Sequence, residues 1–167
     1  MGVRLLLADD HRMLREGLRR SMSDAGFDVV GESTDGVEAV TLATELIPDV
    51  ILMDVTMPNC DGVEACRQVK DAGIASSVVM LTMHADQDVL ANAIRAGASG
   101  YLTKDCSTRE IAEAVRMAAE GETVLSPQLA RSMLEEVRKL DDPAPDASQA
   151  ESVVSKREEE VLQLIAD

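Results

Sequence analysis

Residues 50–58 of this chain read Val-Ile-Leu-Met-Asp-Val-Thr-Met-Pro, so four apolar residues run directly into an aspartate at position 54. A continuous apolar run of this length is typical of a strand buried on both faces of a parallel sheet. Met57 and Pro58 are expected to shape the turn that follows. Acidic side chains are rarely buried at the end of such a strand, so Asp54 is a candidate functional group.

Three further short apolar runs also end in polar groups. They are residues 3–8 before Asp9 and Asp10, residues 78–81 before Thr82, and residues 101–103 before Lys104. The carboxyl ends of parallel strands meet in one crevice, which is the usual place for ligands and chemistry. Three carboxylates, a hydroxyl and an ammonium are therefore expected to share one pocket. Such a set suits a divalent cation and a phosphoryl group.

Strand-like runs alternate with segments of helical periodicity along most of the chain. The predicted strands are residues 3–8, 29–31, 50–53, 78–81 and 101–103, and the predicted helices are residues 13–25, 35–46, 62–72, 86–96 and 108–120. Five strand-helix units of this kind predict an α/β fold, with a doubly wound, five-stranded parallel sheet and right-handed crossovers.

The pattern changes after Gly121, so we assign residues 1–122 to one domain. Residues 123–152 are expected to be a linker that contains a helix at about 126–140, followed by an acidic, proline-bearing stretch. Residues 153–167 begin another helical pattern, with Ser155 and Glu158 in the positions of a capping box. We interpret this segment as the truncated start of a second, all-α domain.

The charge balance excludes some functions for the chain by itself. It has 31 acidic and 16 basic residues and a net charge of −15, whereas nucleic-acid-binding modules neutralise phosphates with Lys and Arg. A membrane surface would also repel it, and no apolar run is long enough to span a bilayer. The first residues do not resemble a signal peptide, and the three cysteines have no disulfide or metal-site spacing. These features predict a cytoplasmic protein with reduced thiols.

The strand-end groups suggest phosphoryl transfer at Asp54. Clustered carboxylates raise at least one pKa unless a cation offsets their repulsion. Mg²⁺ suits two or three carboxylates because it is a hard ion that prefers oxygen ligands and keeps several waters. Asp54 can act as a nucleophile, since aspartates form aspartyl-phosphate intermediates. Lys104 would offset charge on the phosphoryl oxygens, and the Thr82 hydroxyl would hydrogen-bond one of them.

At these positions the chain resembles the receiver domain of two-component response regulators. The residues that carry the resemblance are Asp9, Asp10, Asp54, Val55, Thr56, Met57, Pro58, Asp61, Gly62, Thr82, Ala96, Gly97, Ala98, Gly100, Tyr101 and Lys104. The resemblance covers residues 3–121 and implies a flavodoxin-like fold. It also implies that Asp54 accepts a phosphoryl group from a phosphohistidine of a sensor histidine kinase.

The resemblance assigns the metal site as well. Asp10, Asp54 and the main-chain carbonyl of Thr56 would bind Mg²⁺, with Asp9 acting directly or through water. The chain would not be an enzyme for other substrates. It would undergo only self-phosphorylation and slow autodephosphorylation at Asp54.

The same resemblance implies a switch. Lys104, Thr82 and the main-chain amides after Asp54 would hold the phosphoryl oxygens. Thr82 would move toward the phosphoryl group, and Tyr101 would enter the space that it leaves. This movement would change the face formed by the fourth helix, the fifth strand and the fifth helix. Separately, the position of His84 two residues after Thr82 leaves two interpretations open: a residue near the phosphoryl site that tunes hydrolysis, or a surface-loop histidine.

Residues 155–166 resemble the opening of a LuxR-type helix-turn-helix domain, and His11 and Asp105 also resemble this class. The full-length protein would then be a transcription regulator of the NarL/FixJ class. It would form a homodimer on activation and bind promoter DNA through its effector domain. The recognition helix is not among these residues, so this chain is not expected to bind DNA specifically.

Alternatives from other functional classes remain. A haloacid-dehalogenase-like phosphatase also uses a strand-end aspartate and Mg²⁺, but it carries a second aspartate two residues later as general acid. That position is Thr56 here. A receiver that serves only as a docking module would not need the full set of acids, hydroxyl and ammonium. A nucleotide-binding protein is disfavoured because no glycine-rich phosphate loop follows the first strand.

Overall fold

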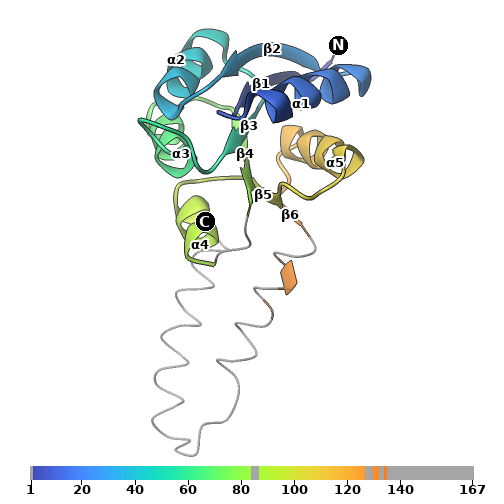
Figure 1. Ribbon diagram of the computed structural model, residues 1–167. Coiled ribbons are helices and arrows are strands. Elements are labelled where there is room, and N and C mark those ends of the chain that lie inside the picture. The colour runs from blue at the N-terminus through green and yellow to red at the C-terminus, as the bar shows by residue number, and fades with distance from the viewer. Residues whose placement is uncertain (1, 84–86, 127–129, 132–133, 135–167) are drawn as a thin grey trace, which may run out of the picture.

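The structure is a computed structural model that describes residues 2–83, 87–126, 130–131 and 134 (Figure 1). Its strands are β1 (Arg4–Ala8), β2 (Asp28–Ser33), β3 (Val50–Asp54), β4 (Ser77–Thr82), β5 (Gly100–Thr103) and β6 (Val124–Leu125). Its helices are α1 (Arg12–Asp24), α2 (Gly36–Leu46), α3 (Gly62–Asp71), α4 (Gln87–Arg95) and α5 (Thr108–Ala119). All strand pairs are parallel, in the order β2-β1-β3-β4-β5-β6. The predicted doubly wound α/β sheet is therefore confirmed.

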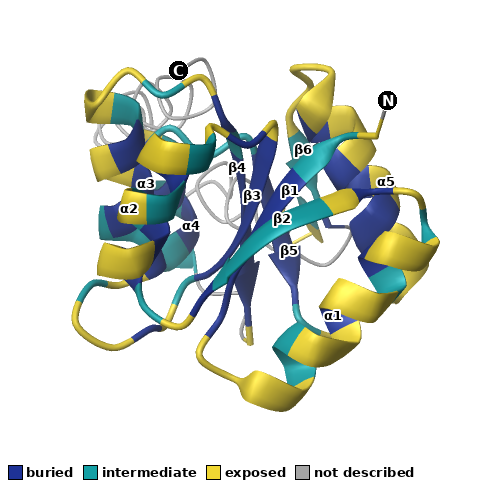
Figure 2. Cartoon of the chain, turned by 90° about the horizontal axis from the view of Figure 1, so that it is seen from above, coloured by how far each residue is buried: buried dark blue, intermediate teal, exposed yellow. Residues whose placement is uncertain are grey.

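Helices cover both faces of this sheet (Figure 2). Helices α1 and α5 lie on one face, and α2, α3 and α4 lie on the other. Successive residues of the central strands face opposite layers: Leu5 and Leu7 pack under α1 and α5, while Leu6 and Ala8 pack under the other three helices. Burial on both faces explains the continuous apolar runs in the sequence. The ends of the strands, rather than their faces, are left for function.

The expected count of five strands is wrong by one. Strand β6 pairs with β5 through Gly100 with Val124 and Tyr101 with Leu125. The sequence shows only two apolar residues here, after the turn at Gly121, and so short a run gives no clear strand pattern. The sheet consequently extends past the boundary predicted at residue 122. Strand β2 is also longer than residues 29–31, because its pairing with β1 continues to Ser33.

Three helices begin at side-chain caps near the carboxyl ends of the strands. Asp35 and Asp61 each accept a hydrogen bond at 2.8 Å from the main-chain amide three residues later. Ser107 forms a capping box with Glu110 at the start of α5. These caps satisfy amides that an isolated helix leaves without partners, so they fix where the loops end.

The helix predicted at 126–140 falls mostly outside the described residues. The buried Ser126 accepts a main-chain hydrogen bond from Ala130 at 2.9 Å, and residues 130, 131 and 134 are helical. The rest of the predicted linker, the segment 153–167 and His84 lie outside the described residues. Among the helices of the described part, none combines the length and apolar composition needed to cross a bilayer.

Candidate functional site

The candidate site lies at the carboxyl ends of β1, β3, β4 and β5. Main-chain hydrogen bonds continue the sheet pairing one residue beyond three of these strands. They join the amide of Asp9 to the carbonyl of Ser33 at 3.0 Å, Val55 to Leu81 at 2.9 Å, and Lys104 to Thr82 at 2.7 Å. The loops that carry the polar groups therefore start from fixed positions on the sheet.

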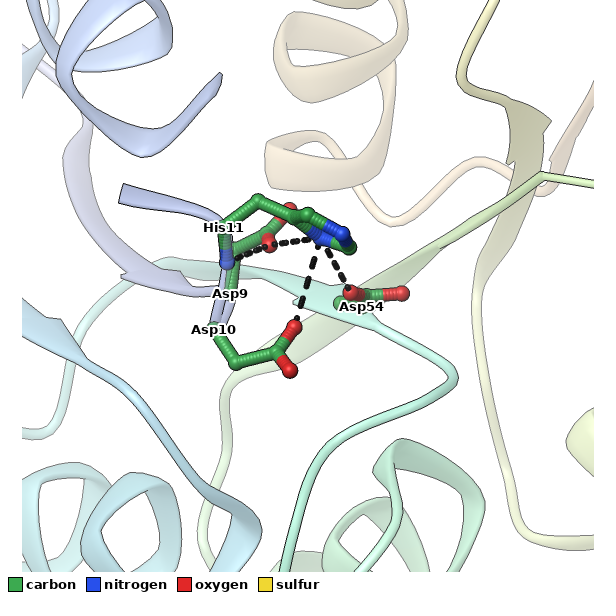
Figure 3. A group of neighbouring side chains, drawn as sticks. All are labelled: Asp9, Asp10, His11 and Asp54. Carbon is green, nitrogen blue, oxygen red and sulfur yellow. Dashed lines mark hydrogen bonds and ion pairs between the residues drawn. The ribbon is translucent and has the colours of Figure 1, made fainter. Parts of the chain in front are cut away.

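The three predicted carboxylates meet at this edge (Figure 3). Asp9 and Asp54 are each only 2% exposed, whereas the side chain of Asp10 is 36% exposed. One potential ligand atom from each of these aspartates and from His11 lies within 4.8 Å of all the others. Together they form what we call the acidic cluster, which consists of Asp9, Asp10, His11 and Asp54.

Lys104 places its ammonium against the two buried carboxylates. Its Nζ lies 2.9 Å from Asp54 Oδ2 and 3.4 Å from Asp9 Oδ2, and its side chain is 7% exposed. A buried cation beside two buried anions offsets part of their repulsion, but one positive charge does not balance two negative charges. A net negative charge remains at the site.

His11 is a site residue to which the sequence reasoning assigned no role. Its Nδ1 lies 3.2 Å from Asp9 Oδ1, 3.3 Å from Asp10 Oδ1 and 3.8 Å from Asp54 Oδ2. It is also 3.3 Å from Lys104 Nζ. The sequence offered one signal for this role, which is the position of His11 directly after two adjacent acids. A helix that starts there can turn the His11 side chain back over the loop.

The environment of Asp54 disfavours its charged form. Burial raises the pKa of this carboxyl most, and the negative charge of Asp9 raises it further. The hydrogen bond and charge of Lys104, and a hydrogen bond from the Thr56 amide at 3.2 Å, oppose the shift, but the net pKa is still raised. A cation bound here would relieve the same cost.

The remaining predicted residues occupy different depths. Thr56 is exposed, and its main-chain amide donates a hydrogen bond to the Asp54 side chain. Thr82 is 8% exposed and ends β4, one residue beyond Leu81, the partner of Asp54 in the sheet. Tyr101 is 1% exposed and packs in the core on the side of α2, α3 and α4, so it does not line the acidic cluster in this conformation.

The acidic cluster has the chemistry of a magnesium site. It offers three carboxylates, which are the oxygen ligands that Mg²⁺ prefers. Asp9 Oδ2 is buried and has no hydrogen-bond partner among the described residues, apart from its ion pair with Lys104. Buried carboxylate oxygens are normally fully partnered, so an oxygen in this state fits a site that binds a cation.

Comparison with known families agrees with this geometry. Residues 5–116 match the response regulator receiver domain family, and this range includes all four strand ends that form the site. The chain belongs to the response regulators.

Relatives place this response regulator in the NarL/LuxR family. LiaR of Bacillus subtilis (strain 168), named as a transcriptional regulatory protein, is 41% identical over 167 residues, which cover 99% of this chain and 77% of LiaR. The signal receiver domain of NarL from Mycobacterium tuberculosis is 36% identical, with a TM-score of 0.71 over 72% of this chain and 98% of that one. A LuxR-family two-component response regulator from Aurantimonas sp. SI85-9A1 is also 36% identical, with a TM-score of 0.78 over 81% of this chain and 98% of that one. The phosphatase alternative gains no support from these response-regulator relatives.

Proposed function

We propose that Asp54 is the phosphoacceptor of this response regulator and that its donor is a phosphohistidine of a sensor histidine kinase. The observation that carries the proposal is that the Asp54 carboxylate, a member of the acidic cluster, is 2% exposed and lies 2.9 Å from the Lys104 ammonium. In the transfer, an Asp54 carboxylate oxygen bonds to phosphorus as the phosphorus–nitrogen bond of the donor breaks. The donor's imidazole keeps the electron pair of that bond.

We assign the metal ligands to Asp10, Asp54 and the main-chain carbonyl of Thr56, with Asp9 binding directly or through water. Mg²⁺ bound there would neutralise charge on the carboxylates and on the phosphoryl oxygens. The raised pKa of Asp54 and the net negative charge of the site support the assignment. The metal would also keep the Asp54 carboxylate ionised and hence nucleophilic.

Lys104 and Thr82 are the proposed partners of the phosphoryl oxygens. Lys104 already lies within hydrogen-bond distance of Asp54, so a short movement carries its ammonium to a transferred phosphoryl group. Thr82, at the end of the adjacent strand, would donate its hydroxyl. Its movement would let Tyr101 turn from the core, changing the surface of α4, β5 and α5. We also propose that His84 tunes the hydrolysis of the aspartyl phosphate.

We further propose that this change controls dimerisation and, through the effector domain of the full-length protein, binding to promoter DNA. The NarL/LuxR relatives, named as transcriptional regulators, support this output. Regulation of transcription would occur in the cytoplasm. The catalysis would be limited to self-phosphorylation and slow autodephosphorylation at Asp54.

The test is intact-protein mass spectrometry after incubation with acetyl phosphate and Mg²⁺. We expect the wild type to gain one phosphoryl group, and both Asp54→Asn and the wild type in EDTA to gain none. An unmodified wild type, under conditions that label a control receiver, would overturn the phosphoacceptor proposal and favour a phosphorylation-independent docking module.

The same preparation separates the receiver from a phosphatase. A small phosphate ester is mixed with the wild type and released phosphate is followed over many enzyme equivalents. A receiver releases no more phosphate than its slow autodephosphorylation permits. Sustained turnover that disappears in Asp54→Asn would instead support the phosphatase.

A further inference from the structure

The side chain of Arg15, in α1, connects the acidic cluster to the end of strand β2. Its Nη1 donates a hydrogen bond of 2.8 Å to the main-chain carbonyl of Asp9. Its Nε lies 3.2 Å from Glu32 Oε1, and the side chain is only 14% exposed. A guanidinium can hold two acceptors at once because its donors have a fixed, planar arrangement.

All but one of the polar atoms of Asp9 take part in hydrogen bonds. Its amide donates to Ser33 at 3.0 Å, its carbonyl accepts from Arg15, and its Oδ1 accepts from the amide of His11 at 2.7 Å. The atom left over is Oδ2, which is buried and aimed into the cluster beside Lys104. The bonds to Ser33, Arg15 and His11 thus determine where Oδ2 lies.

We propose that Arg15 is a positioning residue for the metal-binding carboxylates, with Glu32 as its anchor. The inference rests on the proposed magnesium site and extends it to a residue that does not contact the metal. Three neighbouring carboxylates repel one another, and this repulsion drives the loop of Asp9 and Asp10 away from Asp54. Arg15 opposes the displacement by tying the Asp9 carbonyl to a carboxylate on the sheet.

Arg19 provides a matched comparison one helical turn along α1. It also pairs with Glu32, at 3.4 Å from Oε2, but its side chain is 60% exposed. In the described part of the chain Arg19 makes no hydrogen bond to the loop of Asp9 and Asp10. The two arginines share a helix, a charge and a partner, and they differ in burial and in the bond to the Asp9 carbonyl.

The experiment measures the Mg²⁺ dissociation constant of the 167-residue chain by isothermal titration calorimetry, and the labelling of Asp54 by acetyl phosphate at saturating Mg²⁺. Circular dichroism in EDTA shows whether each variant is folded. Arg15→Gln is expected to weaken Mg²⁺ binding about 10-fold, since outer-shell residues commonly contribute 10- to 100-fold in affinity. At saturating Mg²⁺ its labelling rate should return to within about twofold of wild type, because the metal then restores the loop.

Arg19→Gln should bind Mg²⁺ within about twofold of wild type, because its charge is exposed and screened. Glu32→Gln, which keeps Arg15 but weakens its anchor, should lose about threefold in affinity, below the outer-shell range because the Asp9 contact is retained. If Arg15→Gln does not fold, Glu32→Gln measured against Arg19→Gln decides the question in the same way.

The outcomes separate this inference from the proposed function. If the wild type binds Mg²⁺ and the folded Arg15→Gln variant binds it with unchanged affinity, the inference about Arg15 is overturned and the proposed metal site stands. Equal losses in Arg15→Gln and Arg19→Gln also overturn it, since they would reflect charge and not position. A wild type that binds no Mg²⁺ overturns the proposed metal site, and this inference with it.

Discussion

Asp54 ends β3 and Asp35 follows β2, so both lie at the carboxyl ends of strands on the same edge of the sheet, yet their surroundings are opposite. Asp35 is only partly buried, caps α2 through a 2.8 Å hydrogen bond from the Glu38 amide, and accepts another from Asn59 at 3.1 Å. These bonds lower its pKa, the Glu38 amide most. Asp54 is buried, and burial raises its pKa. The cap carboxylate stabilises the fold as it stands, whereas the site carboxylate is held in a state that a bound cation would improve.

The largest effect on the surroundings of Asp54 is expected from a substitution at Gly62, which packs behind Asp54. A Cβ atom at position 62 would lie 2.1 Å from the carbonyl oxygen of Asp54 and 2.9 Å from the side chain of Met80. Because backbone cannot move aside as a side chain does, Gly62→Ala should destabilise the protein by about 3 kcal/mol, the upper range for overpacking. Urea unfolding monitored by circular dichroism measures this loss.

Gly17 is the control for this substitution. A Cβ there meets nothing within 4 Å, in the middle of α1. Gly17→Ala should therefore stabilise the protein by about 0.5–1 kcal/mol, the usual gain from alanine in a helix. If Gly62→Ala and Gly17→Ala change the free energy of unfolding in the same direction, close packing at Gly62 does not determine the position of Asp54.

The next largest effect is expected from Asp54→Asn in EDTA. The substitution removes one of two buried negative charges while keeping nearly the same shape, so the folded state should gain about 1 kcal/mol, an ordinary size for a single substitution. Mg²⁺ should raise the thermal midpoint of the wild type and have a smaller effect on the variant. A variant that is less stable than wild type in EDTA would show that the Lys104 ion pair outweighs the repulsion.

The advantage of asparagine at position 54 should depend on pH. In the folded state the Asp54 carboxyl binds its proton more tightly than in the unfolded state, where its pKa has the ordinary value of 3.8. Between that value and the raised pKa the folded chain holds more protons, so its stability increases as pH falls. The gap between variant and wild type in EDTA should shrink from pH 7 toward pH 4.

The sheet and the strand-end residues could be predicted because their signals are local. The run before Asp54 and the turns around it determine a buried strand and its end, and parallel topology then brings Asp9, Thr82 and Lys104 to one edge. Strand β6 was not predictable in this way. Its two residues become a strand only because β5 offers a free edge beside them.

The contacts of Arg15 were harder to predict than those of His11, which directly follows the two acids. Arg15 lies in α1, and helical periodicity alone assigns it to a polar surface. The contacts of Arg15 join a helix to the carbonyl of one strand end and the carboxylate of another, Asp9 and Glu32. No spacing along the chain encodes such a bridge.

The contribution of a helix cap to stability is tested at Asp61, which caps α3 in the loop after Asp54. Asp61→Ala removes the acceptor for the Glu64 amide, held at 2.8 Å, and should cost about 1 kcal/mol, the typical value for an N-cap. Asp61→Ser retains an acceptor and should stay within about 0.5 kcal/mol of wild type. A loss in the serine variant as large as in alanine would mean that the Asp61 charge matters more than its hydrogen bond.

The smallest effect is expected from Asp35→Asn, which keeps a side-chain oxygen at the cap and removes only the charge. The folded pKa of Asp35 lies below 3.8, so its carboxylate contributes stability above that pH and loses the contribution as pH falls through the folded value. The variant should be slightly less stable than wild type at pH 7, and the gap should close only below pH 3.8. The gap at Asp54 has the opposite sign and closes at higher pH. Parallel curves for the two variants would show that burial at Asp54 is not what distinguishes the site carboxylate from the cap.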